Sequence, residues 1–159
     1  MRLSISKTIP AIALALAACG PSENTIAVPG GTVTQSTDGS TTTITATNGE
    51  TTQISTGQAV ALPASMPLFP GATVTTSITG GNETQKTISV AFDTSASVEE
   101  VIAFYKGKAA ALGLAEALSS TESGVSTLVA SKDQMSVIVA ASKGTKGTEA
   151  QITWSAPPS

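Results

Sequence analysis

Histidine is absent from this 159-residue sequence, and Cys19 is its single cysteine. Without histidine, Ser-His-Asp and Cys-His catalytic arrangements lack their general base. The same absence removes the usual nitrogen ligand of metal sites, and one cysteine supplies neither a tetrahedral sulfur site nor an internal disulfide. The sequence therefore predicts a protein that is not an enzyme and that holds no metal and no cofactor.

Charged residues are scarce as well, at 12% of the chain against roughly 25% in ordinary soluble domains. Arg2 and Lys7 belong to the N-terminal segment described next, and the remaining chain keeps six of the eight basic residues against 11 acidic ones. A chain with this negative balance lacks the basic surface that binds phosphate backbones. We expect no nucleic-acid partner, and a polar surface built from hydroxyl groups.

The N-terminal segment combines the basic residues Arg2 and Lys7 with an apolar run over residues 9–18, and ends in the sequence LAAC at residues 16–19. The run of about ten residues is too short for a membrane-spanning helix, which needs about 20. Its charged start and small residues before a cleavage point are typical of a secretory signal peptide. The LAAC sequence resembles the lipobox of bacterial lipoproteins, in which the cysteine becomes the first residue of the mature protein.

This resemblance implies that residues 1–18 are removed and that Cys19 carries a diacylglycerol thioether and a further acyl chain on its amine. Each buried methylene of these chains contributes about 0.8 kcal/mol to membrane attachment. Gly20 follows the cysteine where aspartate favours inner-membrane retention in enterobacterial lipoproteins, so we expect a location in the outer membrane, facing the periplasm. The alternative is an ordinary secretory signal followed by an incidental cysteine.

Two segments of unusual composition follow. Residues 19–31 contain proline and a Gly-Gly pair without hydrophobic periodicity, and predict a tether. Residues 32–57 form a Thr-rich module, with eleven threonines among the 25 residues from 32 to 56. Asp-Gly at residues 38–39 and Asn-Gly at residues 48–49 favour two-residue hairpin turns, because both pairs tolerate positive φ. The three predicted strands cover residues 32–37, 41–47 and 51–55.

The Thr-rich module has too few large apolar side chains to form a core of its own. We expect it to pack on another part of the chain, to pair with another sheet, or to stay partly mobile. Two alternatives remain open for the same composition. One is a disordered Thr-rich stalk, and the other is a ten-residue repeat that continues as a β-solenoid or an amyloid-like stack.

A Pro-rich connector over residues 58–70 leads to a domain over residues 71–155 and a disordered tail at residues 156–159. Alternating apolar residues predict strands in this domain. These strands cover residues 73–79, 85–93, 115–120, 124–131, 134–141 and 149–155. The predicted fold class is α+β, a small antiparallel sheet with one main helix in the order β-β-α-β-β-β-β, preceded by the Thr-rich β-hairpin module.

The sequence has capping signals at both ends of the predicted helix. Ser97 and Glu100 have the spacing of a capping box, which predicts that the helix starts at Val98. Gly113 predicts the end, because glycine accepts the left-handed conformation that closes a helix. One apolar stripe runs between these ends at spacings of three and four. Its members are Val98, Val101, Ile102, Tyr105, Ala109 and Leu112.

Residues 62–72, LPASMPLFPGA, together with VIAFYK at residues 101–106 and LGL at residues 112–114, resemble a domain of uncharacterised proteobacterial lipoproteins. The family pattern is roughly LPxxFPxYPGA followed by eeVxxFYxxxLxxxG. Phe69 stands where that family often has tyrosine, and Leu114 where it often has tryptophan. The family carries no assigned activity, so the resemblance implies no catalytic residue.

Two functions from different classes are consistent with these residues. The first is a lipid-anchored envelope protein with a non-catalytic recognition or structural role, held in the membrane through lipid on Cys19. Its partner would be an envelope protein or peptidoglycan, met through the hydroxyl-rich strands. The alternative is a periplasmic small-molecule or lipid-binding module with a pocket between helix and sheet, lined by Phe104, Met135 and Trp154.

Overall fold

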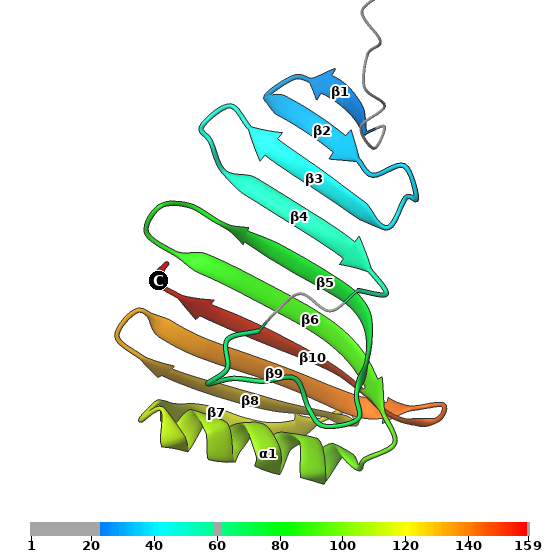
Figure 1. The fold of residues 1–159 in the computed structure, drawn as a ribbon. Helices are drawn as coiled ribbons and strands as arrows, with labels where there is room; N and C mark the ends of the chain where they lie inside the picture. The colour runs from blue at the N-terminus through cyan, green and yellow to red at the C-terminus, as the bar shows by residue number, and fades with distance from the viewer. Residues whose placement is uncertain (1–22, 59–61, 159) are drawn as a thin grey trace, which may run out of the picture.

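The computed structural model describes residues 23–58 and 62–158 of the chain, as ten strands and one helix. The strands form one antiparallel sheet in the order β1-β2-β3-β4-β5-β6-β10-β9-β8-β7 (Figure 1). The elements are β1 (Asn24–Val28), β2 (Gly31–Gln35), β3 (Thr41–Ala46), β4 (Thr51–Thr56), β5 (Thr73–Gly81), β6 (Lys86–Thr94), α1 (Val98–Ala111), β7 (Ala115–Glu122), β8 (Val125–Lys132), β9 (Met135–Gly144) and β10 (Gly147–Ala156). The predicted signal peptide and Cys19 lie outside the described residues. No helix among the described residues is long and apolar enough to cross a membrane.

The predicted fold class is wrong in its main feature. The described residues do not form a small sheet with one main helix beside a separate Thr-rich module, but a single ten-stranded sheet with one short helix. The Thr-rich strands join the rest because β4 pairs with β5 in register, from Thr51 opposite Gly81 to Thr56 opposite Thr76. A free strand edge carries unpaired amides and carbonyls, and pairing with the neighbouring hairpin satisfies them.

Within the Thr-rich segment, β2, β3 and β4 lie where the sequence predicts strands. Gly39 and Gly49 have φ values of 69° and 85°, so the Asp-Gly and Asn-Gly pairs supply the positive φ that the turns require. The structure adds β1 inside the segment predicted as a tether, and this strand pairs with β2 over five residue pairs.

The helix has the predicted start and capping box. Ser97 Oγ accepts a hydrogen bond from the Glu100 amide at 3.2 Å, and Glu100 Oε2 accepts one from the Ser97 amide at 2.8 Å. At the other end, Gly113 has a φ of 69° and the Leu114 amide donates to the Ala109 carbonyl at 3.0 Å. Helix α1 is therefore closed at both ends by contacts that its own sequence specifies.

The two faces of the sheet differ. Helix α1 and residues 62–70 lie over one face of the sheet, at the end formed by the neighbouring strands β6, β10, β9, β8 and β7 (Figure 1). We call this the covered face, and the opposite one the open face. The covered face holds the core because alternate side chains of each strand point toward it. Its buried apolar strand residues are Ile88, Val90, Phe92, Leu128, Ala130, Val137, Val139, Ala141, Ala150, Ile152 and Trp154.

Candidate functional site

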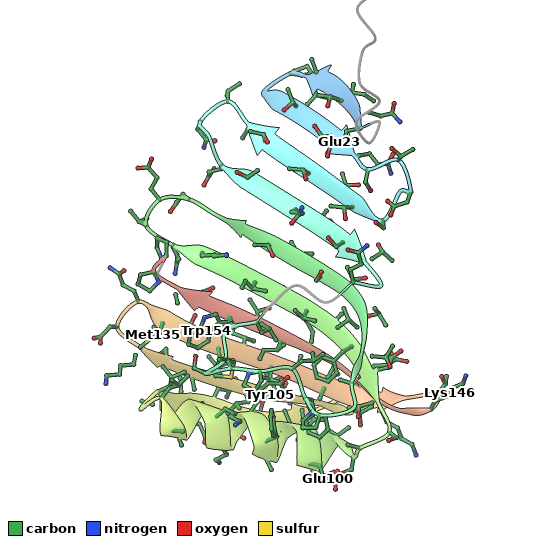
Figure 2. All side chains as sticks on the ribbon, in the orientation of Figure 1. Glu23, Glu100, Tyr105, Met135, Lys146 and Trp154 are labelled. Atoms are coloured by element: carbon green, nitrogen blue, oxygen red, sulfur yellow. The ribbon has the colours of Figure 1, made fainter. Side chains whose placement is uncertain are left out.

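Tyr105 occupies the middle of the space between α1 and the covered face (Figure 2). It belongs to the apolar stripe of α1, where the buried residues Val101, Tyr105 and Ala109 follow one another at four-residue spacing. Its side chain is fully buried, with 0% exposure. Its hydroxyl oxygen Oη has no hydrogen-bond partner within the described part of the chain. A buried polar group without a partner costs about 1 to 3 kcal/mol, so this hydroxyl is an exception in the core.

Aromatic rings surround the Tyr105 ring on two sides. Phe104 meets it edge to face at a centroid distance of 5.1 Å, and Phe92 of β6 lies at 6.4 Å in a tilted arrangement. Phe69, from residues 62–70, packs in turn against Phe104 at 5.2 Å. These contacts combine the connector, the helix and the sheet in one apolar cluster with a single hydroxyl at its centre.

Burial raises the pKa of Tyr105 to about 12, because the low-polarity interior disfavours the phenolate. The backbone of Phe69 lies near Oη and opposes this rise only in part, without forming a hydrogen bond that satisfies the oxygen. The phenol is therefore neutral at physiological pH. It can donate its proton in a hydrogen bond to an acceptor, and it cannot serve as a base.

Residues 62–70 close the space between helix and sheet from the side. Met66 in this segment is fully buried, and Leu68 and Phe69 pack partly buried against the core. The Met66 amide donates to the Pro63 carbonyl at 2.8 Å, and three prolines restrict the backbone of the segment. The segment contributes buried side chains to the cluster although none of its residues belongs to a strand of the sheet.

The three residues predicted to line a pocket lie at two places around the core, with Met135 and Trp154 at one and Phe104 at the other. Trp154 is 6% exposed on β10, and Met135 lies near it on β9, since Trp154 pairs with Val137 two residues away. Figure 2 shows Met135 and Trp154 toward one end of the covered face, away from Tyr105. Phe104 packs against the Phe69 and Tyr105 rings, with Lys108 Nζ at 5.3 Å from its ring centroid. The unpartnered hydroxyl of Tyr105 was not predicted, because the apolar stripe indicates burial but not the partners of Oη.

Two surface hollows lie away from this cluster. One, of about 290 Å³, lies at the β9–β10 turn beside Asp93, Lys146 and Glu149. The other, of about 380 Å³, lies over β4 and β5 and is lined by Thr79 and Pro158 among others. No three metal-ligating side chains gather within residues 23–58 or 62–158, so Asp93 and Glu149 do not form a metal centre. The second hollow also holds a buried hydroxyl without a partner among the described residues, Thr79 Oγ1, but no aromatic ring lines it.

Comparison with known protein families gives a match to the part of the chain that contains this cluster. Residues 73–152 match a family model described as START domain-like. The match covers 80 of the 159 residues, half of the chain, and runs from the first residue of β5 into β10. It includes α1 and Tyr105 and leaves out β1 to β4. None of the curated proteins or solved structures compared with the chain matches it.

Proposed function

The chain belongs to the START domain-like family, and from this premise we propose that it is a non-catalytic module that binds an apolar small molecule between α1 and the sheet. The observation that carries the proposal is the Tyr105 hydroxyl, which is buried in an aromatic cluster and lacks a hydrogen-bond partner. Binding sites for small molecules combine an apolar lining with a few polar groups that fix the ligand's orientation. Tyr105 Oη supplies such a group.

The chemistry of Tyr105 defines the ligand class. Because burial keeps the phenol neutral, its hydroxyl donates to an acceptor such as a carbonyl, ester or carboxylate oxygen. The rings of Phe92 and Phe104 offer apolar contact around that acceptor. The ligand is therefore a largely hydrocarbon molecule with an oxygen acceptor, which enters by displacing residues 62–70 from the aromatic cluster.

The substitution Tyr105→Phe tests this proposal, because it removes the hydroxyl and keeps the ring. We expect the affinity for a fluorescent long-chain fatty acid to fall about 5- to 10-fold, the value of one hydrogen bond. The free energy of unfolding should stay constant or rise, because the variant no longer buries an unpartnered hydroxyl. Fluorescence titration and thermal unfolding of the full chain measure the two effects.

Two controls separate this result from a general loss of structure. A hydrocarbon probe without the carboxyl group should bind wild type and Tyr105→Phe equally. Thr79→Val removes the other buried hydroxyl oxygen that lacks a partner among the described residues, on β5, and should leave the fatty-acid affinity unchanged. Equal fatty-acid affinity of wild type and Tyr105→Phe would contradict the proposed role of Oη.

We further propose that lipid on Cys19 anchors the module to the bacterial outer membrane, facing the periplasm. The lipobox-like sequence at residues 16–19 supports the anchor, and Gly20 after the cysteine supports the outer membrane over the inner membrane. Cys19→Ala should leave the protein unprocessed or soluble after cell fractionation, because the lipid attachment point is gone. A variant that matured and partitioned into membranes like wild type would rule the anchor out.

A further inference from the structure

The open face carries an ordered pattern of side chains across the strands from β5 to β7. Residues paired across neighbouring strands line up in rows, and successive rows lie two residues apart along each strand. One row, which we call the aliphatic row, has four exposed or half-exposed apolar side chains and two hydroxyl residues in its middle. Its members are Leu118, Val129, Ile138, Thr153, Ser89 and Ile78.

The exposure of this row is high for large apolar side chains. Leu118, Ile138 and Ile78 are 49%, 45% and 38% exposed. The two hydroxyls between them satisfy each other, because Ser89 Oγ and Thr153 Oγ1 lie 3.0 Å apart. A row of aliphatic side chains whose polar members are already paired loses little when it is covered.

The next row consists mainly of small side chains, and we call it the small row. Its members are Ser120, Thr127, Ala140, Gln151, Ala91 and Thr76. Two hollows lie along its side toward Glu149, which lines both of them. One, of about 260 Å³, lies beside Ala140, and the other, of about 350 Å³, lies beside Ala91 and Asp93. The open face therefore has a raised aliphatic row beside a lower row with hollows.

The two outer rows differ in charge. The acidic row lies beyond the small row, and its members are Glu122, Val125, Ser142, Glu149, Asp93 and Thr73. The hydroxyl row lies beyond the aliphatic row, and its members are Ser131, Ser136, Ser155, Thr87 and Gly80. These four rows of described residues contain no lysine or arginine.

We propose that the open face binds a second copy of this chain in a symmetric dimer. The two-fold axis lies in the interface, perpendicular to the strands, between the aliphatic and small rows. This axis places the aliphatic row of each copy on the small row of the other, so that Ile138 faces Ala140 and Leu118 faces Ser120. The aliphatic row of each copy thus fills the small row of the other. The same contact occurs twice, once on each side of the axis, as in every isologous interface.

The positions of the acidic residues favour the same two-fold axis. The perpendicular axis places the acidic row on the hydroxyl row, so Glu149 faces Ser155 and Asp93 faces Thr87. Ser155 Oγ and Thr87 Oγ1 share one hydrogen bond at 2.9 Å, which leaves one of their two hydroxyl protons free to donate to a carboxylate. An axis parallel to the strands would place each acidic row on its equivalent, which is unfavourable. The anionic surface of a bacterial membrane is likewise a poor occupant of a face whose charged residues in these rows are all acidic.

The area of the four rows agrees with the area that each partner buries in a stable interface. The strands from β5 to β7 span about 29 Å at about 4.8 Å for each strand, and four rows span about 27 Å. The resulting footprint is about 800 Å² for each copy, which is the size of a standard specific interface.

Sedimentation of the full chain in mild detergent tests the dimer. We expect wild type at micromolar concentration to have twice the chain mass. Ile138→Lys and Leu118→Glu should give the single mass, with dissociation constants raised at least about 100-fold, because each buries two unpaired charges in the dimer. Both substituted side chains are exposed in one copy, so the fold should persist, as near-ultraviolet circular dichroism will show.

The matched control is Ala103→Lys, an exposed position on α1 away from the open face, which should leave the dimer intact. A wild-type chain of single mass would overturn the proposal, as would dimers unaffected by Ile138→Lys. A single mass together with protection of the open face by phospholipid vesicles would assign that face to a membrane, and would overturn it equally.

Discussion

At the scale of single residues, Tyr105 and Asp38 show how surroundings set the behaviour of a polar group. Tyr105 is buried without a partner, and burial raises its pKa to about 12. Asp38 is exposed in the turn between β2 and β3, where Ser36 Oγ donates to its carboxylate at 2.6 Å and Ser40 donates through its amide and hydroxyl. These hydrogen bonds, with that of Ser36 the largest cause, lower the pKa of Asp38 to about 2.

The stability of the turn that contains Asp38 should therefore depend on the titration of Asp38 only in the acidic range. Its carboxylate stabilises the folded turn fully above the ordinary pKa of 3.8, and this contribution is lost as the pH falls through about 2. Ser36→Ala should raise the pKa of Asp38 toward its ordinary value, since the main cause is removed. Carbon-13 shifts of the Asp38 carboxyl measure both titrations, and an unchanged midpoint in the variant would refute the assignment to Ser36.

Part of the candidate site can be predicted from the sequence at this scale. The spacing of the α1 stripe correctly predicts that Tyr105 faces the core, because helical periodicity is a local property. It does not predict that Oη lacks a partner, since potential partners come from distant segments such as residues 62–70. The predicted lining by Phe104, Met135 and Trp154 follows from their apolar character alone, and hydrophobicity does not specify which apolar residues meet in the fold.

At the scale of elements, the strands differ in how they are held. All residues of β1 are exposed and it has one neighbour, whereas β6 has four buried residues and lies between β5 and β10. Strands with little burial open locally at low free-energy cost. Strand β1 should therefore be the first part of the sheet to open, and β6 among the last.

Hydrogen exchange followed by mass spectrometry checks this order. Amides of β1 should exchange first, those of β2 to β4 later, and those of β6, β9 and β10 last, because the last group surrounds the core. Protection of β1 equal to that of β6 would contradict the order. Full exchange of β3 within seconds would instead favour the disordered Thr-rich stalk.

Local patterns in the sequence predict the ends and turns of these elements correctly, but they do not predict which distant strands pair with one another. The capping box at Ser97 and Glu100 and the Asp-Gly and Asn-Gly turns require only neighbouring residues, and the structure confirms them. The pairing of β6 with β10 joins residues separated by the whole of α1 and β7 to β9, and no periodicity specifies it. For the same reason, the sequence allows pairing of the Thr-rich strands with another sheet as one alternative among several, without specifying β5 as the partner of β4.

At the scale of the whole molecule, the sheet separates the proposed anchor from the proposed ligand site. Asn24 begins β1 five residues after Cys19, which an extended chain spans in at most about 17 Å. Nine strand spacings of about 4.8 Å then separate β1 from β7, a distance of roughly 40 Å along the sheet. Strands β1 to β4, outside the family match, would thus hold the START domain-like part away from the membrane.

Native mass spectrometry of the full chain, extracted from its own envelope, tests the central claim of ligand binding most directly. We predict a wild-type spectrum with one non-covalent apolar molecule for each chain, in addition to the covalent lipid on Cys19. Tyr105→Phe should carry that molecule at lower occupancy, in line with the loss of affinity of about 5- to 10-fold expected from one hydrogen bond, and Thr79→Val should carry it at wild-type occupancy. A wild-type chain that carries no molecule, or a Tyr105→Phe variant that carries the same one at wild-type occupancy, would contradict a binding site between α1 and the sheet that depends on Tyr105.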